Sequence, residues 1–322
     1  MARKTTKKAS AKIQPAVTSL FYDMPSDTTG ATRFIDLSAD LSRLNRKLMR
    51  QGYQYAVAGV TVTDTVGVVS ALEITISTAG NTWVTQNAWT KGKALWDEMN
   101  QEVLDDNPSV QGKWADYKVA LSENMASANT LSALNGAGGA LPGGYEWAKS
   151  TYVIPQHDVD PATGAVLPAA EFTACLVGPD DLANGVFSLV KAYEDSRATV
   201  QDITPNVPVG LPNSFYLKLT DDGSQDPELA TVIIDQNDQP PYSMTPGAYP
   251  GGNAFTTSEA TTRVALGVKN DFTPTLQLPG FTAECGLLRI DAKRSAGTDN
   301  IRVQIHLVPG SYRGVMAHPM GQ

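Results

Sequence analysis

The side chains that most often carry out catalysis are few and scattered in this chain. The chain has three histidines, His157, His306 and His318. Their spacing does not match a metal site, and none has a convincing nucleophile as a partner. The chain has no GxSxG elbow and no dinucleotide fingerprint. The glycines of 135–144 (NGAGGALPGG) lack the Lys-Ser or Lys-Thr ending of a phosphate loop. We therefore predict that the protein is not an enzyme and binds no cofactor.

Acidic pairs and cysteines give equally weak signals for a metal. Asp235 and Asp238 could help to hold a calcium ion at a subunit boundary, but a turn is the simpler interpretation. The two cysteines, Cys175 and Cys285, are far apart and lack a CxxC or a nearby histidine pair. We expect two buried thiols in a reducing compartment, and no metal site.

The strongest chemical signal is a basic N-terminus that would suit phosphate groups. The first twelve residues contain five cations and no acid: Arg3, Lys4, Lys7, Lys8 and Lys12. This stretch holds too little apolar surface to offset its ordering entropy, so residues 1–15 are predicted to be a disordered arm. Such arms commonly bind polyanions, although a solubilising tail or an import signal would look similar.

The basic charge is confined to one end of an acidic chain. Residues 1–50 carry 10 basic and 4 acidic side chains, and the remaining residues carry 15 and 29. The whole chain has a formal net charge of -8. A protein that bound nucleic acid across its whole surface would be basic throughout, so only one end of this chain is suited to phosphate.

A predicted helix extends the positive end. Leucines recur at three- and four-residue steps over 37–51, behind Ser38 or Asp40 as a cap. The opposite face of this helix would hold four further candidates for nucleic-acid binding: Arg43, Arg46, Lys47 and Arg50. A charge run on a helix is usually only a solvated face, but these four continue the charge of the arm.

The rest of the sequence predicts an all-β fold. Aromatic and β-branched runs separated by Gly, Pro, Asn and Asp predict strands at 16–24, 53–64, 66–78, 169–177, 214–220, 229–236, 261–268, 281–291 and 301–308. In the last of these, Ile301 to Leu307 alternates apolar and polar residues, which suits a sheet with one wet face. Further helices are expected at 88–104 and 189–200. This pattern favours a sandwich or a jelly roll.

The domain prediction is a single body over 16–322 with insertions around 85–165 and 237–256. The second insertion is an aromatic loop rich in proline and glycine, and long loops of this kind usually have a function. Tyr242 and Tyr249 in that loop, and Tyr312 and Met316 near the C-terminus, are candidates for contacts between subunits. The loop could equally be an outer surface. No run is long and apolar enough for a membrane helix, and we expect no membrane span.

Three segments follow patterns that occur together in one family of proteins. Residues 33–62 (RFIDLSADLSRLNRKLMRQGYQYAVAGVTV) have an aromatic-IDLS start, an LS-x-x-NR-x-x-x-RQG helix and a following strand. Residues 281–291 (FTAECGLLRID) match a late strand, and residues 308–320 (VPGSYRGVMAHPM) match a closing segment. In this order and spacing the three segments resemble the capsid proteins of small circular Rep-encoding single-stranded DNA viruses. The resemblance covers both ends of the chain and leaves the region from about 97 to 279 poorly matched.

This resemblance implies a single jelly roll of about eight main strands. It also implies a shell protein, with copies of the chain assembling into an icosahedral virion of about 60 subunits around a single-stranded genome. The basic arm would point inward and neutralise phosphates. Assembly would take place inside the host cell, possibly its nucleus, and the host surface receptor is unknown.

Other classes of protein remain open. A carbohydrate-binding or polysaccharide-active β-sandwich would also be acidic and rich in loops, with Trp83, Trp89 and Trp96 as stacking platforms. Against this, Trp89 and Trp96 lie on the apolar side of a predicted helix, where core packing is more common. A cellular single-strand-binding protein should show basic residues interleaved with aromatics through its strands. Nearer alternatives are a coat protein of an RNA virus and a double jelly-roll phage capsid.

Overall fold

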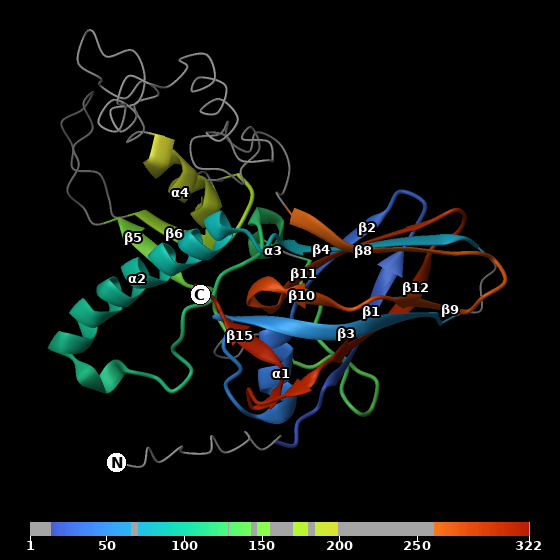
Figure 1. Ribbon diagram of the computed structural model, residues 1–322, viewed down its shortest axis with the longest axis horizontal. Coiled ribbons are helices and arrows are strands. Elements are labelled where there is room, and N and C mark those ends of the chain that lie inside the picture. The colour runs from blue at the N-terminus through green and yellow to red at the C-terminus, as the bar shows by residue number, and fades with distance from the viewer. Residues whose placement is uncertain are drawn as a thin grey trace, which may run out of the picture.

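The protein is built around a β-sandwich of two antiparallel sheets. The computed structural model describes residues 14–65, 70–127, 129–142, 147–154, 170–179, 184–198 and 261–321. One sheet, sheet A, has the order β1-β12-β3-β10, with β9 and β15 also paired to β3. The other, sheet B, has the order β2-β11-β4-β8. Figure 1 shows the two sheets as the upper and lower layers on the right of the molecule.

The strands of the sandwich come from the two ends of the described chain. They are β1 (Ser19–Ser26), β2 (Ala31–Asp36), β3 (Tyr53–Asp64), β4 (Leu72–Ala79), β8 (Thr261–Lys269), β9 (Thr275–Leu278), β10 (Phe281–Ala283), β11 (Leu287–Arg294), β12 (Asp299–Leu307) and β15 (Ala317–Pro319). A small pair, β13 (Pro309–Gly310) and β14 (Gly314–Val315), lies outside both sheets. The predicted β-sandwich is therefore confirmed.

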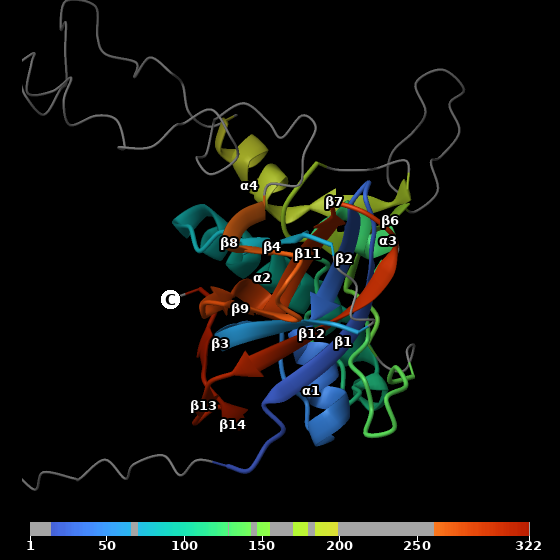
Figure 2. The same cartoon turned by 90° about the vertical axis from the view of Figure 1, so that its right-hand side faces the viewer.

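Between β4 and β8 the chain leaves the sandwich and builds a second layer. Its described elements are α2 (Trp83–Asp106), the 3₁₀ helix η1 (Pro108–Val110), α3 (Glu123–Ser127), β5 (Thr151–Ile154), β6 (Ala170–Cys175), β7 (Val186–Ser188) and α4 (Leu189–Ala198). The predicted strands at 214–220 and 229–236 and the predicted aromatic loop lie outside the described residues. Both views place α4 at the opposite side of the molecule from α1 (Leu37–Asn45) (Figures 1 and 2).

The sandwich and the inserted layer each have a hydrophobic core. The sandwich core receives Ile301, Val303, Ile305 and Leu307 of β12, all at most 3% exposed, while Arg302 on the other face is exposed. Burial of each such side chain is worth roughly 1.5–3 kcal/mol. The second core packs side chains of α2, β6 and α4 against Phe34 of β2 and Leu287 of β11. The inserted layer therefore rests on one end of the sandwich.

Several predicted boundaries are wrong because local geometry overrides the pattern. The predicted strand 281–291 breaks at the 3₁₀ helix η3 (Glu284–Gly286), where Cys285 and Gly286 have φ angles of 55° and 68°. This turn carries the chain from sheet A to sheet B. The predicted helix 88–104 begins earlier, at Trp83, because Thr82 accepts a hydrogen bond from Thr85 N. Strands β2, β5, β7 and β9 are not in the prediction.

A buried ion-pair cluster ties the two sheets together. Asp64 of β3 accepts two hydrogen bonds from Arg294 of β11, both of 2.9 Å, and lies 3.4 Å from Lys269 Nζ. Ser26 and Ser70 take two further hydrogen bonds from the guanidinium. All three charged side chains are at most 2% exposed. Burial alone would raise the pKa of Asp64, but Arg294 and Lys269 hold that pKa below its usual value.

We predict that Asp64→Ala destabilises the fold by about 3–5 kcal/mol, because it leaves two buried cations without a counter-charge. Asp23→Ala is the matched control, since Asp23 also forms a two-bond pair with an arginine, Arg302, but on the exposed face of sheet A. That loss should cost at most about 1 kcal/mol. Urea unfolding measures both values, and equal losses would contradict the role assigned to the buried cluster.

Candidate nucleic-acid interface

One buried carboxylate organises the start of α1. Asp36 is the N-cap residue: its Oδ1 accepts hydrogen bonds from Ala39 N at 3.0 Å and from Ser38 Oγ at 2.5 Å. The sequence prediction of Ser38 or Asp40 as the cap is therefore wrong. The extended backbone of Asp36, at the end of β2, is what allows its side chain to reach the free amide of the first turn.

The other oxygen of Asp36 collects three donors from distant segments. Its Oδ2 accepts from Gln51 Nε2 at 2.7 Å, Trp147 Nε1 at 2.9 Å and Lys149 Nζ at 2.8 Å. Burial would raise the pKa of Asp36, but the charge and hydrogen bond of Lys149 outweigh it and leave that pKa below its usual value. Asp36 thus fixes α1, the start of β3 and part of the inserted layer to one point.

Helix α1 is shorter than predicted, which relocates most of the basic residues. It ends at Asn45, and Arg46 follows in the left-handed conformation with φ 51°. Ser42 Oγ then accepts a hydrogen bond from Met49 N at 2.7 Å, which turns the chain back. Only Arg43 is on the helix. The other three predicted residues lie in the turn that follows it: Arg46, Lys47 and Arg50.

The chain that leads to the predicted arm leaves the sandwich beside this turn. Val17 N donates to Asn45 Oδ1 at 2.7 Å, and Asn45 Nδ2 donates to Val17 O at 3.3 Å. On its other side Ala16 approaches Gly314, where a Cβ would lie 2.4 Å from the Ala16 Cβ. Gly314 is therefore required for this close approach. The arm residues themselves lie outside the described residues: Arg3, Lys4, Lys7, Lys8 and Lys12.

Asn45 and Gly314, which hold this exit, belong to segments that carry five cationic side chains, here called the basic end: Arg43, Arg46, Lys47, Arg50 and Arg313. Arg43 pairs with Asp40 at 3.2 Å, and Arg50 pairs with Asp116 at 3.4 Å. Arg46 and Lys47 are exposed and have no ion-pair partner in the described part of the chain. Arg313 donates to Leu48 O. Sequence reasoning missed Arg313, although it lies in the closing segment that carried the resemblance.

The predicted contact residues have different environments. Tyr312 is half-buried: its ring stacks on Tyr53 at 3.9 Å, and its hydroxyl accepts a hydrogen bond from Arg50 N at 3.0 Å. Met316 is 41% exposed and free to meet another molecule. Tyr312 therefore supports the basic end from within its own chain. Tyr242 and Tyr249 lie outside the described residues.

The three segments that carry the family resemblance meet around α1. Gly286 of the second segment lies so close that a Cβ there would be 3.1 Å from the Tyr55 ring and 3.3 Å from Ser38 N. Tyr55 in turn donates to Arg50 O at 2.7 Å, and the third segment contributes Tyr312 at the same place. Residues that are far apart in the sequence thus form one cluster at the basic end.

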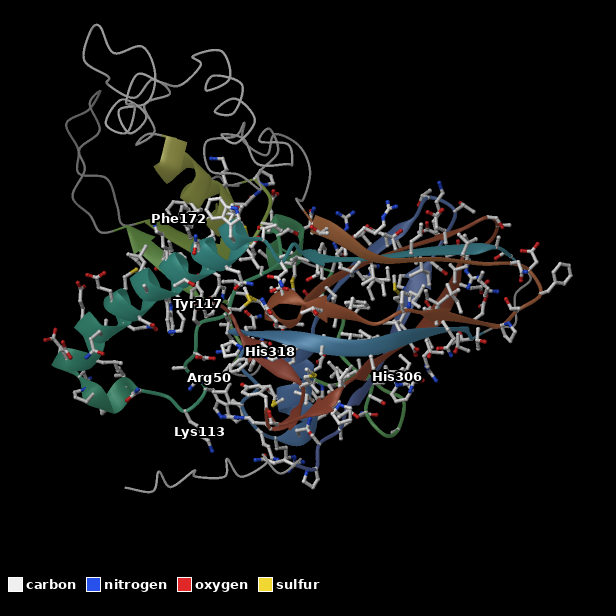
Figure 3. All side chains as sticks on the ribbon, viewed as in Figure 1. Arg50, Lys113, Tyr117, Phe172, His306 and His318 are labelled. Carbon is white, nitrogen blue, oxygen red and sulfur yellow. The ribbon has the colours of Figure 1, made fainter. Side chains whose placement is uncertain are left out.

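The other candidate chemistry does not come together. His306 lies on the face of sheet A between Ser19 and Thr61, and His318 lies on β15, away from His306 (Figure 3).

Within the described ranges no three His, Cys, Asp or Glu side chains gather in a way that could hold a metal ion. Both cysteines are buried thiols, as predicted. No described helix has the length and apolarity needed to cross a membrane.

The tryptophans considered as sugar platforms do not form a common surface. Trp89 is 6% exposed, Trp96 is partly buried in the same core, and Trp83 is 44% exposed. The predicted core packing of Trp89 is confirmed.

Comparisons of the chain with protein-family models, with curated proteins and with solved structures found no match. The interpretation of the basic end therefore depends on its own geometry and charge.

Two buried carboxyl groups, one on α1 and one on η3, have raised pKa values. Burial raises the pKa of Asp40 to about 6, although the hydrogen bond from Tyr22 and the charge of Arg43 oppose this shift. Burial likewise raises the pKa of Glu284 to about 7, against hydrogen bonds from Gln54 and Gln86. Both groups bind a proton more tightly in the folded chain than in the unfolded chain, so the folded state gains stability as the pH falls.

We therefore predict that the melting temperature rises by about 3 °C or more between about pH 7.5 and pH 5, since roughly 1 kcal/mol moves it by about 2–4 °C. Asp36 and Asp64, whose pKa values are lowered, lose their contribution only at more acidic pH. Differential scanning fluorimetry across this range measures the effect. Glu284→Gln should flatten the upper part of the profile, and an unchanged profile in this variant would contradict the assignment.

Proposed function

We propose that this protein is a viral coat protein. Copies of it assemble into an icosahedral shell of about 60 subunits and package single-stranded DNA through the basic N-terminal arm and the basic end. In this role the protein belongs to the virion, and assembly takes place inside the host cell. The observation that carries the proposal is that the exposed cations Arg46 and Lys47 directly follow Asn45, which holds Val17 at the point from which the arm departs.

The strand order supports a jelly roll as the form of the sandwich. If β9 and β10 are counted as one broken strand and the three-residue β15 is set aside, eight strands are divided equally between the two sheets. The first strands pair with the last: β1 with β12, and β2 with β11. This nested pairing is typical of jelly rolls, which build many viral capsids as well as lectins.

The distribution of charge distinguishes the coat-protein role from that of a general nucleic-acid binder. The outer face of β12 presents Arg302, but Asp23 of β1 neutralises it with two hydrogen bonds. At the basic end, in contrast, Arg46 and Lys47 are exposed without an acidic partner among the described residues. An inward-facing basic end on an otherwise acidic subunit would bind a genome and leave the outer surface soluble.

A strand edge provides a surface for self-association. Strand β8 pairs only with β4, so within the described chain its other edge is open. Leu266 and Val268 on β8 are 47% and 64% exposed, and Phe272 in the following turn is 90% exposed. Exposed apolar side chains on an open edge are typical of surfaces that another chain covers. In the proposed shell that chain is a neighbouring copy.

We predict that deletion of Met1 to Lys12, combined with Arg46→Gln and Lys47→Gln, leaves closed shells but lowers their nucleic acid content by about half or more. The matched control is Lys91→Gln on α2, an exposed lysine away from the basic end. Absorbance at 260 and 280 nm of density-gradient fractions measures the content. Unchanged content in intact shells would reject the packaging role, and failure of the unmodified protein to form shells would reject the coat-protein proposal.

A further inference from the structure

A cavity of about 340 Å³ lies next to the basic end, between α2 and the segment that joins α1 to β3. Arg50, Gly52 and Tyr53 line it from that segment. Trp89 and Lys93 line it from α2, and Asp116 and Tyr117 line it from the loop after η1. In Figure 3 the labelled Tyr117 lies just beneath α2, and the labelled Arg50 lies below Tyr117. Its volume is in the range of small-molecule sites, about 300–1,000 Å³.

Trp89 forms part of the wall and has an unused hydrogen-bond donor. Its side chain is 6% exposed, and its Nε1 has no acceptor in the described part of the chain. A buried donor without a partner is rare and costs about 1–3 kcal/mol. The Trp89 ring packs closely on Gly52, where a Cβ would lie only 3.0 Å from the ring. It also packs edge-to-face on Tyr117, with ring centroids 5.9 Å apart.

The polar groups of the cavity stand together at one side. Arg50 and Lys93 have side chains that are 50% and 33% exposed, so both can reach a ligand and water at once. Asp116 lies 3.4 Å from Arg50, and burial raises the pKa of this carboxyl. A second cavity shares these three residues and continues along α2 past Trp96. The charged groups therefore lie where the two cavities meet; the first has mainly aromatic and apolar walls, and the second has mainly polar walls.

We propose that this cavity binds one nucleotide of a single strand, with the base among Tyr53, Trp89 and Tyr117 and the phosphate at Arg50 and Lys93. Aromatic rings beside cations are the usual way in which proteins hold unpaired nucleotides, since any base can stack and every unit carries a phosphate. Asp116 accepts hydrogen bonds from base amino groups. A sugar would suit the rings and the carboxylate but carries no charge for the half-exposed Arg50 and Lys93 to bind, and inorganic phosphate leaves the rings unused.

This inference rests on the proposed function, because the strand in question is the packaged one, which reaches the cavity through Arg50 of the basic end. It adds a site for the base to the phosphate contacts of the arm. A duplex cannot enter, because its bases are paired and stacked. The site therefore discriminates single-stranded from double-stranded nucleic acid, which the arm alone does not.

The test uses the full chain, freed of nucleic acid by nuclease, and a ten-nucleotide oligo(dT) that carries 5-iododeoxyuridine. Irradiation and mass spectrometry then identify the crosslinked peptide. We expect crosslinks at Tyr53, Trp89 or Tyr117 that free thymidine monophosphate reduces and inorganic phosphate does not. Crosslinks confined to other parts of the chain would overturn the inference. Crosslinking of free 5-iododeoxyuridine monophosphate at these residues, with no crosslink to the oligonucleotide, would assign the cavity to free nucleotides and overturn its role in the strand.

Two substitutions on one helix give a matched comparison. Lys93→Gln should weaken oligo(dT) binding about tenfold at a salt concentration that suppresses the arm, whereas Lys91→Gln should leave it unchanged. Within the described part of the chain Lys93 forms one ion pair, with the half-exposed Asp97, so the variant is expected to fold. Equal affinities of the two variants would overturn the inference. If shells package normally but the cavity shows no crosslink and Lys93→Gln binds like Lys91→Gln, the nucleotide site is rejected and the coat-protein proposal stands. If the cavity is crosslinked and Lys93→Gln binds more weakly but no shell forms, the coat-protein proposal alone is rejected.

Discussion

The position of the basic end depends on the buried carboxylate of Asp36. Its two oxygens accept five hydrogen bonds, from the first turn of α1, from Gln51 before β3, and from Trp147 and Lys149 of the inserted layer. Gln51 extends the network, since its Oε1 accepts from Val119 N at 2.6 Å. Because a buried charge is tolerated only when it is fully paired, these segments are held together, and the turn with Arg46, Lys47 and Arg50 is fixed with them.

A second buried carboxylate, Asp64, plays the corresponding part where β3 ends. Asp36 lies at the end of β2 and holds α1, whereas Asp64 lies at the end of β3 and joins both sheets through Arg294. Apolar side chains from the strands of both sheets supply the core of the sandwich. The inserted layer then closes over one end and creates the cavity beside Arg50 and Trp89. The fold thus leaves one end with free cations and uses the charges inside the body for structure.

The sequence predicted the elements with a clear period and missed those decided by single contacts. Strand β3 has its predicted bounds, and the alternation in β12 matches its buried and exposed faces. Helix α1 ends early because Ser42 bonds to Met49 N, and the 281–291 strand breaks at the left-handed Cys285. Neither contact has a periodic signal. The sequence predicted the charge of the basic end but not the contribution of Arg313, which lies over 200 positions from the turn after α1. The cavity around Trp89 has no sequence signal either, because its lining also includes the distant Pro319 and Met320.

In the proposed shell the basic end faces the interior and the acidic body faces outward. Electron cryo-microscopy of the purified recombinant protein tests this orientation, because a reconstruction places α1 and residues 14–17 relative to the shell. We expect uniform closed particles in which Arg46 and Lys47 line the inner surface next to density for nucleic acid. Particles with α1 on the outer surface, or a protein that remains monomeric under all assembly conditions, would contradict it.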